Sequence, residues 1–201
     1  LVQEAADVLT AQRHRTAKEF LSRVKKELEF LNMPSVRLSI SAGRSGWKPD
    51  GQDELEFLIS SNVGEEPKPL AKIASGGELS RVMLSIKNVL AQKDQIGSAI
   101  FDEIDTGVSG KAAQKIGQKL KEVSQNRQVI CVTHLAQVAV YADHHLLIHK
   151  QEENGRTFTH ITRLTQEQRV EEIARIISGE NLTDTAMDNA REMLQLAASE
   201  L

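Results

Sequence analysis

Three groups of residues in this sequence have the side chains and the context needed to bind a nucleotide and cleave it. Residues 99–103 form a short apolar run that ends in two adjacent carboxylates, Asp102 and Glu103. Asp102 could hold Mg²⁺, a hard cation that prefers oxygen ligands, and Glu103 could then orient or deprotonate a water. Taken alone, an apolar strand that ends in Asp-Glu is common in α/β proteins and is more often structural.

The second group is Ser75-Gly76-Gly77-Glu78, which stands just before a helix pattern. Glycines let the backbone approach a phosphate closely, and a helix N-terminus offers unpaired N–H groups and partial positive charge. The hydroxyl of Ser75 could add a hydrogen bond. A loop with a helix N-cap accounts for the same four residues equally well.

The third group is Thr133-His134, directly after the apolar run 129–132. A histidine at the carboxyl end of a strand lies where open α/β sheets bind ligands. A partly exposed loop histidine without a ligand fits the same residues equally well.

A long amphipathic helix is predicted at the start of the chain. Residues 1–31 contain no Gly or Pro, and apolar residues recur at alternating spacings of three and four: Ala17, Leu21, Val24, Leu28 and Leu31. This narrow seam favours either the end of a coiled-coil arm or a surface helix packed on its own domain. The helix should end at Asn32-Met33-Pro34, because the residue before proline avoids helical angles.

The rest of the sequence predicts alternating strands and helices. An antiparallel pair is expected over 36–40 and 55–60, joined by the Gly-rich stretch 43–51 and followed by a loop over 61–69. Helices over 79–90 and 110–123 alternate with buried strands over 99–101 and 129–132, the pattern of a parallel α/β sheet. A hairpin around Asn154-Gly155, a helix that starts with a Thr165/Gln168 capping box and ends near Gly179, and a helix over 184–197 complete the chain.

Composition excludes several classes of protein. The 201 residues carry 25 Lys and Arg against 28 Asp and Glu, a net charge of -3, so the chain as a whole is not a strongly basic nucleic-acid binder. The single cysteine, Cys131, rules out an internal disulfide and a Cys-based zinc site and fits a reducing compartment. No apolar run approaches the roughly 18 residues of a membrane span. We therefore expect a cytoplasmic protein without a membrane partner. The chain also begins without Met in what reads as mid-helix, which suggests a fragment.

The order of these motifs resembles the C-terminal lobe of an ABC-type ATPase head. Transporter heads of that family usually have Gln after the glycines and Pro after the acidic pair, whereas this chain has Glu78 and Ile104, as in the branch of structural maintenance of chromosomes (SMC) proteins. Within that branch, four segments closely resemble the RecN family of bacterial DNA repair proteins. They are 70–81, 101–110, 132–135 and 171–175.

The resemblance implies a role for each motif. Asp102 would bind Mg²⁺, and Glu103 and His134 would be catalytic, serving the ATP of their own protomer. The Ser-Gly-Gly motif at 75–77 matches the signature motif of the family, and its residues would contact the ATP of the opposite protomer. Residues 104–107 match the D-loop of the family, which includes a further cofactor-binding residue. These cofactor-binding residues are Ser75, Gly76, Gly77, Glu78 and Asp105.

The resemblance also implies an incomplete head. Residues 1–33 would be the end of a coiled-coil arm, and residues 34–201 the C-terminal lobe. The sequence contains no phosphate-binding loop of the form Gly, any four residues, Gly-Lys-Ser/Thr. The nearest match includes Gly110-Lys111, but it has Asp105 in place of the first glycine and Ala112 in place of the hydroxyl residue. That phosphate-binding loop lies in the N-terminal lobe of RecN-like proteins, so this chain alone should be inactive. Its partners would be that lobe, a second copy through heads and coiled coil, and DNA in the complete, nucleoid-associated protein that repairs double-strand breaks.

Two alternative functions and two weaker candidate sites are also compatible with the sequence. The chain could be a dimerisation module without catalysis or, less in keeping with Glu78 and Ile104, a transporter nucleotide-binding domain. Lys111, Lys115 and Lys119 share one helix face that could meet DNA phosphates, although a solvated face is favoured. The predicted hairpin also pairs His149 with His160, but a zinc site normally needs four ligands. Cys131 is expected in the core.

Overall fold

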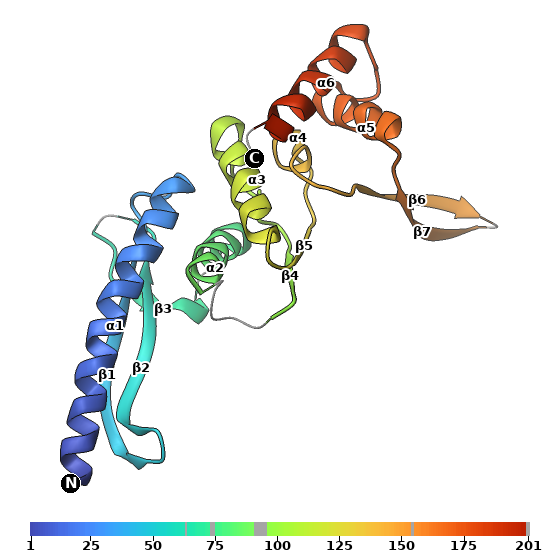
Figure 1. Cartoon of the computed structure of the whole chain (residues 1–201). Helices are drawn as coiled ribbons and strands as arrows, with labels where there is room; N and C mark the ends of the chain where they lie inside the picture. Colours follow the sequence, from blue (N-terminus) through green and yellow to red (C-terminus); the bar gives the residue numbers. More distant parts are fainter. Residues whose placement is uncertain (63, 73–74, 91–95, 154, 200–201) are drawn as a thin grey trace. The chain divides into compact units, whose positions relative to one another are not determined.

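The computed structural model describes the chain except for residues 63, 73–74, 91–95, 154 and 200–201. Contacts within the chain divide it into two compact units, Leu1–Ile96 and Gly97–Leu201, and each combines helices with strands (Figure 1). The mixed α/β class is therefore confirmed. The expected boundary between arm and lobe at residues 33 and 34 stays a prediction.

The first unit is built on a long helix and an antiparallel hairpin. Helix α1 (Val2–Phe30) ends just before Pro34, as predicted. Strand β1 (Arg37–Lys48) pairs with β2 (Gly51–Ser60), and only two residues lie between them. The expectation that 43–51 is a connection was wrong, because the glycines are accommodated within β1 around a register shift between Arg44 and Lys48.

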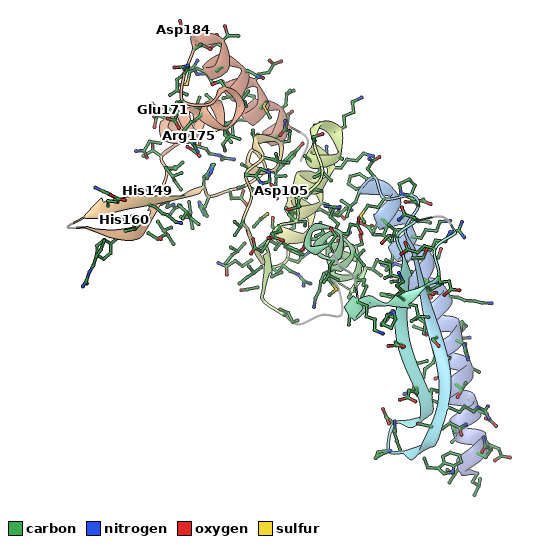
Figure 2. The ribbon with its side chains drawn as sticks, turned by 180° about the vertical axis from the view of Figure 1, so that it is seen from behind. Asp105, His149, His160, Glu171, Arg175 and Asp184 are labelled. Atoms are coloured by element: carbon green, nitrogen blue, oxygen red, sulfur yellow. The ribbon has the colours of Figure 1, made fainter. Side chains whose placement is uncertain are left out.

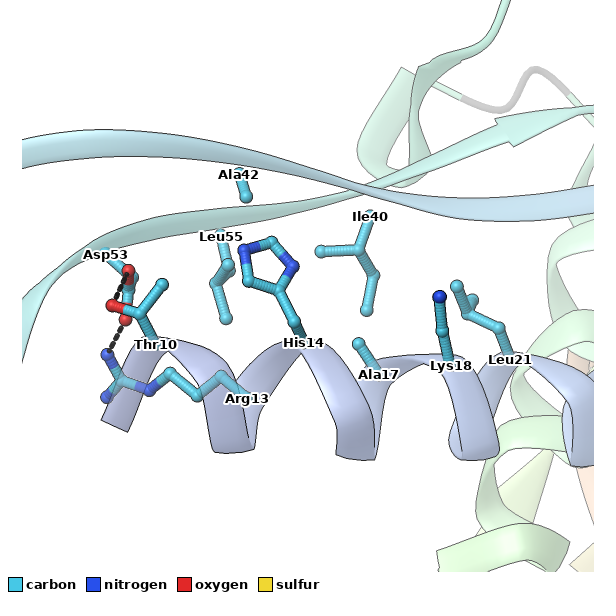
Figure 3. Close-up of a pocket in the computed structure, with 10 residues that line it drawn as sticks. All are labelled: Thr10, Arg13, His14, Ala17, Lys18, Leu21, Ile40, Ala42, Asp53 and Leu55. Carbon is cyan, nitrogen blue, oxygen red and sulfur yellow. Dashed lines mark hydrogen bonds and ion pairs between the residues drawn. The ribbon is translucent and has the colours of Figure 1, made fainter. Parts of the chain in front are cut away.

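Helix α1 lies along this hairpin and is fastened to it (Figure 3). Thr10 Oγ1 and Arg13 Nη1 donate to the two carboxylate oxygens of Asp53 at 2.7 and 2.8 Å. Gly51, with φ +107°, lies so close to α1 that a Cβ there would come within 2.9 Å of Leu9 Cδ2. A pocket with a volume of about 170 Å³ lies between α1 and this hairpin.

The C-terminal half of α1 belongs to the core of the first unit. Its Val24 and Leu28 are buried with residues of the hairpin and of α2 (Gly76–Leu90). The full buried cluster is Val24, Leu28, Met33, Val36, Ile59, Val82 and Ile86. Part of the apolar face of α1 is thus packed against its own unit.

Part of the loop predicted over 61–69 forms strand β3 (Lys68–Pro69), which pairs with β2. It is followed by the short 3₁₀ helix η1 (Leu70–Lys72).

The second unit starts with a parallel strand pair. Strand β4 (Ser98–Phe101) and strand β5 (Gln128–Cys131) are hydrogen-bonded neighbours, with Phe101 opposite Cys131. They are connected by helix α3 (Gly110–Ser124) (Figure 1). This arrangement confirms the β-α-β pattern predicted from the sequence.

The remainder of the second unit is a hairpin and a small helical core. Its elements are α4 (Ala136–Ala139), β6 (Leu146–Glu153), β7 (Arg156–Arg163), α5 (Gln166–Ser178) and α6 (Asp184–Ser199). The capping box of Thr165 and Gln168 is present, and His149 faces His160 in the predicted register. Helix α4 was not predicted. Helices α4, α5 and α6 bury a shared apolar cluster that is rich in alanine and includes Ala139, Ile173 and Ala190.

Across the described residues, no helix combines the length and the apolar character that crossing a membrane requires.

Candidate functional site

The predicted acidic pair and the predicted histidine follow neighbouring parallel strands. Asp102 comes directly after the last residue of β4, and His134 lies three residues beyond β5. Val132 N, one residue beyond β5, donates to the carbonyl oxygen of Phe101, the last residue of β4, at 3.0 Å. The carboxyl ends of parallel strands meet at one edge of a sheet, so the acidic pair and His134 share that edge.

A tight turn separates exposed from buried residues after β4. Asp102 and Glu103 are exposed, whereas Ile104 and Asp105 are 0% and 2% exposed. Glu103 has φ +56°, an uncommon angle for a residue with a side chain, and its carbonyl accepts from Thr106 N at 3.1 Å. The turn leaves both carboxylates of the pair at the surface and buries the next two side chains in the fold.

Asp105 connects the two loops at this edge. Its Oδ2 accepts from Thr133 Oγ1 at 2.5 Å and from His134 N at 3.1 Å. The ring Nδ1 of His134 lies 3.3 Å from the same oxygen, although the His134 side chain is 72% exposed. The loop that carries the histidine is therefore held to the loop that carries the acidic pair.

The donor set fits a magnesium ion that is shared with a nucleotide. The described residues include no cluster of three or more His, Cys, Asp or Glu suited to a metal ion. Mg²⁺ is usually bound by one or two carboxylates together with substrate phosphates and waters. An exposed Asp102 carboxylate at a strand end satisfies that requirement, whereas a metal site built from protein ligands alone does not fit.

Cys131 lies beside these carboxylates. It is half-buried and not in the core as expected. Burial first, and then the charges of Asp105 and Asp102, raise the pKa of its thiol to about 12. The thiol therefore stays protonated near neutral pH, which argues against a role as nucleophile.

The Ser75 loop belongs to the first unit and caps α2. Ser75 Oγ accepts from Glu78 N at 3.4 Å, and Ser75 O accepts from Leu79 N at 3.0 Å. The Glu78 carboxylate accepts from Ser61 Oγ at 3.2 Å. Ser75 thus caps the N-terminus of α2, which agrees with the N-cap interpretation of the sequence. Gly76 beside it is exposed.

Two further predictions from the sequence fared differently. Lys119 does not share an exposed face with Lys111, because its side chain is 7% exposed and its Nζ binds Glu122 at 2.6 Å. That part of the prediction was wrong. His149 and His160 lie together on the β6–β7 hairpin (Figure 2). Their rings are stacked with 5.4 Å between centroids, and within the described part of the chain they belong to no larger group of metal ligands.

The segment 171–175 has a structural role within α5. Glu172 is buried, and its two carboxylate oxygens accept from Arg175 Nε and Nη2 at 2.8 and 2.7 Å.

The sequence did not predict the hydrogen bond between Asp105 and Thr133. The only signal for it was a hydroxyl residue next to His134 at a strand end.

No protein-family model matches the chain. The chain is 42% identical over 203 residues to the DNA repair protein RecN of Halalkalibacterium halodurans, which covers 98% of the chain and 36% of that protein. It is 41% identical over 204 residues to the DNA repair protein RecN of Treponema pallidum, with coverage of 98% and 36%. The chain spans just over a third of the length of these curated relatives. The resemblance to RecN is confirmed.

The fold is similar to solved SMC head domains. A head domain with coiled coil and joint from Pyrococcus yayanosii matches 92% of the chain and 30% of its own length, with TM-score 0.54 and 17% identity. A head domain with an extended coiled coil from Pyrococcus furiosus matches 88% and 41%, with TM-score 0.53 and 18% identity. The predicted SMC-type head fold is thereby confirmed.

Proposed function

We propose that this chain, which is similar to RecN proteins over nearly its whole length, is the C-terminal lobe of the ATPase head of a RecN-type DNA repair protein. In this proposal the complete protein hydrolyses ATP between two heads and acts in recombinational repair of DNA double-strand breaks. The observation that carries it is the shared edge at which Asp102, Glu103 and His134 follow two neighbouring parallel strands.

Each residue at that edge has a chemical role in the proposal. Asp102 binds Mg²⁺ together with the phosphates of ATP, and the metal supplies charge neutralisation on those phosphates. Glu103, exposed beside it, accepts a proton from the attacking water or orients it. His134 presents its exposed ring to the terminal phosphate.

The signature loop would serve the opposite protomer. Ser75, Gly76, Gly77 and Glu78 stand at the N-terminus of a 15-residue helix, where N–H groups and the helix dipole favour an anion. The resemblance also assigned Asp105 to the cofactor-binding residues. We leave it out of the proposed nucleotide contacts, because a side chain that is 2% exposed has almost no surface to offer a nucleotide.

An exposed apolar strand pair supports the view that the head is incomplete. Ile100 and Ile130 are direct neighbours across β4 and β5, and both are exposed, at 72% and 44%. Val132, two residues beyond Ile130 and so on the same face, is 48% exposed. Parallel sheets are normally covered on both faces. We infer that another lobe covers this face and contributes the phosphate-binding loop and its lysine.

The test of this function is Glu103→Gln in the full-length protein. We expect ATP turnover to fall by about 10²–10⁴, the scale of general-base catalysis, while ATP binding and head dimerisation persist. Glu171→Gln, an exposed acidic residue on α5, is the matched control and should keep full turnover. Unchanged turnover in Glu103→Gln would remove the assignment of the base.

Co-expression of this chain with the remaining part of the protein separates catalysis from a purely structural role. Restored Mg²⁺-dependent ATPase supports an ATPase lobe. Stable dimers without activity at any ratio of the two parts would favour the dimerisation module instead. The burial of Val24 and Leu28 inside the first unit already argues against a seam devoted wholly to a partner helix.

A further inference from the structure

Asp105 differs from the two acidic residues that precede it. Asp102 and Glu103 are exposed, but Asp105 is 2% exposed and follows the fully buried Ile104. Burying a carboxylate is costly unless hydrogen bonds compensate for the lost water. Its neighbours therefore indicate what this carboxylate does.

The contacts of Asp105 with the loop after β5 are all made by one carboxylate oxygen, Oδ2. Thr133 Oγ1 and His134 N donate to Oδ2 at 2.5 and 3.1 Å, and the His134 ring Nδ1 lies 3.3 Å away. Thr133 Oγ1 in turn accepts from Leu135 N at 3.1 Å. One buried oxygen thus contacts the hydroxyl, the main chain and the imidazole of the loop after β5.

We propose that Asp105 is a positioning residue that acts through His134. An ionised carboxylate only accepts hydrogen bonds, so the nitrogen beside it, Nδ1, carries the proton of the neutral ring. That fixes the tautomer and the orientation of the imidazole and leaves Nε2, the other ring nitrogen, for a ligand.

This inference rests on the proposed function and adds a step to it. The contacts of Asp105 with Nδ1 and with the backbone N–H of His134 hold the ring from the side opposite Nε2, which is the arrangement that a carboxylate has behind a catalytic histidine. Thr133 supports the arrangement because its hydroxyl holds Asp105 while its oxygen holds the backbone of Leu135.

The first test needs no ATPase activity. In full-length protein labelled with ¹⁵N-histidine, ring signals of His134 are assigned by their loss in His134→Gln. We expect the neutral ring of the wild type to be the Nδ1–H tautomer and the ring in Asp105→Ala to shift to the Nε2–H form. An identical tautomer in both proteins overturns the proposal.

The second test uses Asp105→Asn, which keeps the volume of the side chain and so guards against misfolding. We expect kcat to fall by about 10- to 10³-fold, while KM for ATP changes by less than about 2-fold, because the ring is misoriented without loss of binding surface. In a His134→Ala background, Asp105→Asn should have no further effect on kcat. An equal loss of kcat in both backgrounds overturns the proposal.

Thr133 offers a matched pair of variants. Thr133→Ser retains the hydroxyl and should keep wild-type kcat, whereas Thr133→Val removes it at similar volume and should lower kcat. Equal kcat in the two variants contradicts the role of the hydroxyl. Absence of ATPase activity in the wild-type protein would contradict the proposed function, while the tautomer measurement still decides the role of Asp105.

Discussion

The hairpins β1–β2 and β6–β7 are both antiparallel strand pairs, but their surroundings are very different. Strands β1 and β2 lie against α1, and Asp53 of that hairpin is bound by Thr10 and Arg13. Strands β6 and β7 instead expose apolar side chains, with Ile148 and Ile161 paired directly across the strands at 56% and 65% exposure.

The difference shows where each hairpin obtains its stability. A two-stranded hairpin is marginal by itself in water and needs a packed face. The first hairpin obtains that face within its own unit, from the core that contains Leu28 and Ile59. The second hairpin exposes Ile148 and Ile161, just as β4 and β5 expose Ile100 and Ile130. Such exposed apolar side chains are expected if another part of the protein covers them.

The largest effect is expected from removing the packing of the first hairpin. Leu28→Ala should destabilise the protein by about 2–5 kcal/mol, because Leu28 is 1% exposed within the cluster that joins α1 to β2. Leu196→Ala, at a residue that is 53% exposed, is the matched control and should change stability by less than about 0.5 kcal/mol. Urea unfolding measures both variants, and equal losses would contradict the comparison.

A smaller effect is expected from the polar attachment of the same hairpin. Hydrogen bonds from Arg13 and then from Thr10 lower the pKa of Asp53 below its ordinary value of 3.8. A carboxyl with a lowered folded pKa stabilises the protein above its unfolded pKa, and that stabilisation is lost as the pH falls through the folded value.

Asp53→Asn should therefore lower the melting temperature at pH 7, and the difference from wild type should shrink below about pH 4. Glu54→Gln changes an exposed neighbour and serves as the control. A difference between Asp53→Asn and wild type that stayed constant down to pH 2 would show that the ion pair is not responsible.

The smallest effect is expected in the second hairpin when this chain is studied alone. Ile148→Thr should change its stability by less than about 0.5 kcal/mol, because the side chain is already more than half exposed. In the full-length protein the same substitution should cost about 1–3 kcal/mol if another part of the chain covers this face. Thermal unfolding of both forms decides, and a small effect in both would mean that the face is not covered.

Local signals in the sequence predicted most of the elements. Thr165 and Gln168 form their capping box, Pro34 follows the end of α1, and His149 meets His160 in the register counted from the turn. The error at residues 43–51 arose because glycines usually mark a connection, whereas here β1 extends past them with a register shift between Arg44 and Lys48.

Burial within the site could not be predicted in the same way. Asp105 follows Asp102 and Glu103 and looks like a third exposed acidic residue, yet it is buried against Thr133, which lies 28 positions away. Lys119 likewise has the spacing of a surface lysine but is buried beside Glu122.

The sequence by itself determined the type and order of most helices and strands, and the order of motifs that relates the chain to RecN proteins. These features depend on neighbouring residues and on fixed spacings of two or of three to four, which are readable without coordinates. Only the tertiary structure decided which carboxylate faces solvent and which one holds His134. Hydrogen bonds between loops depend on how separate strands are placed side by side, and no local periodicity encodes that placement.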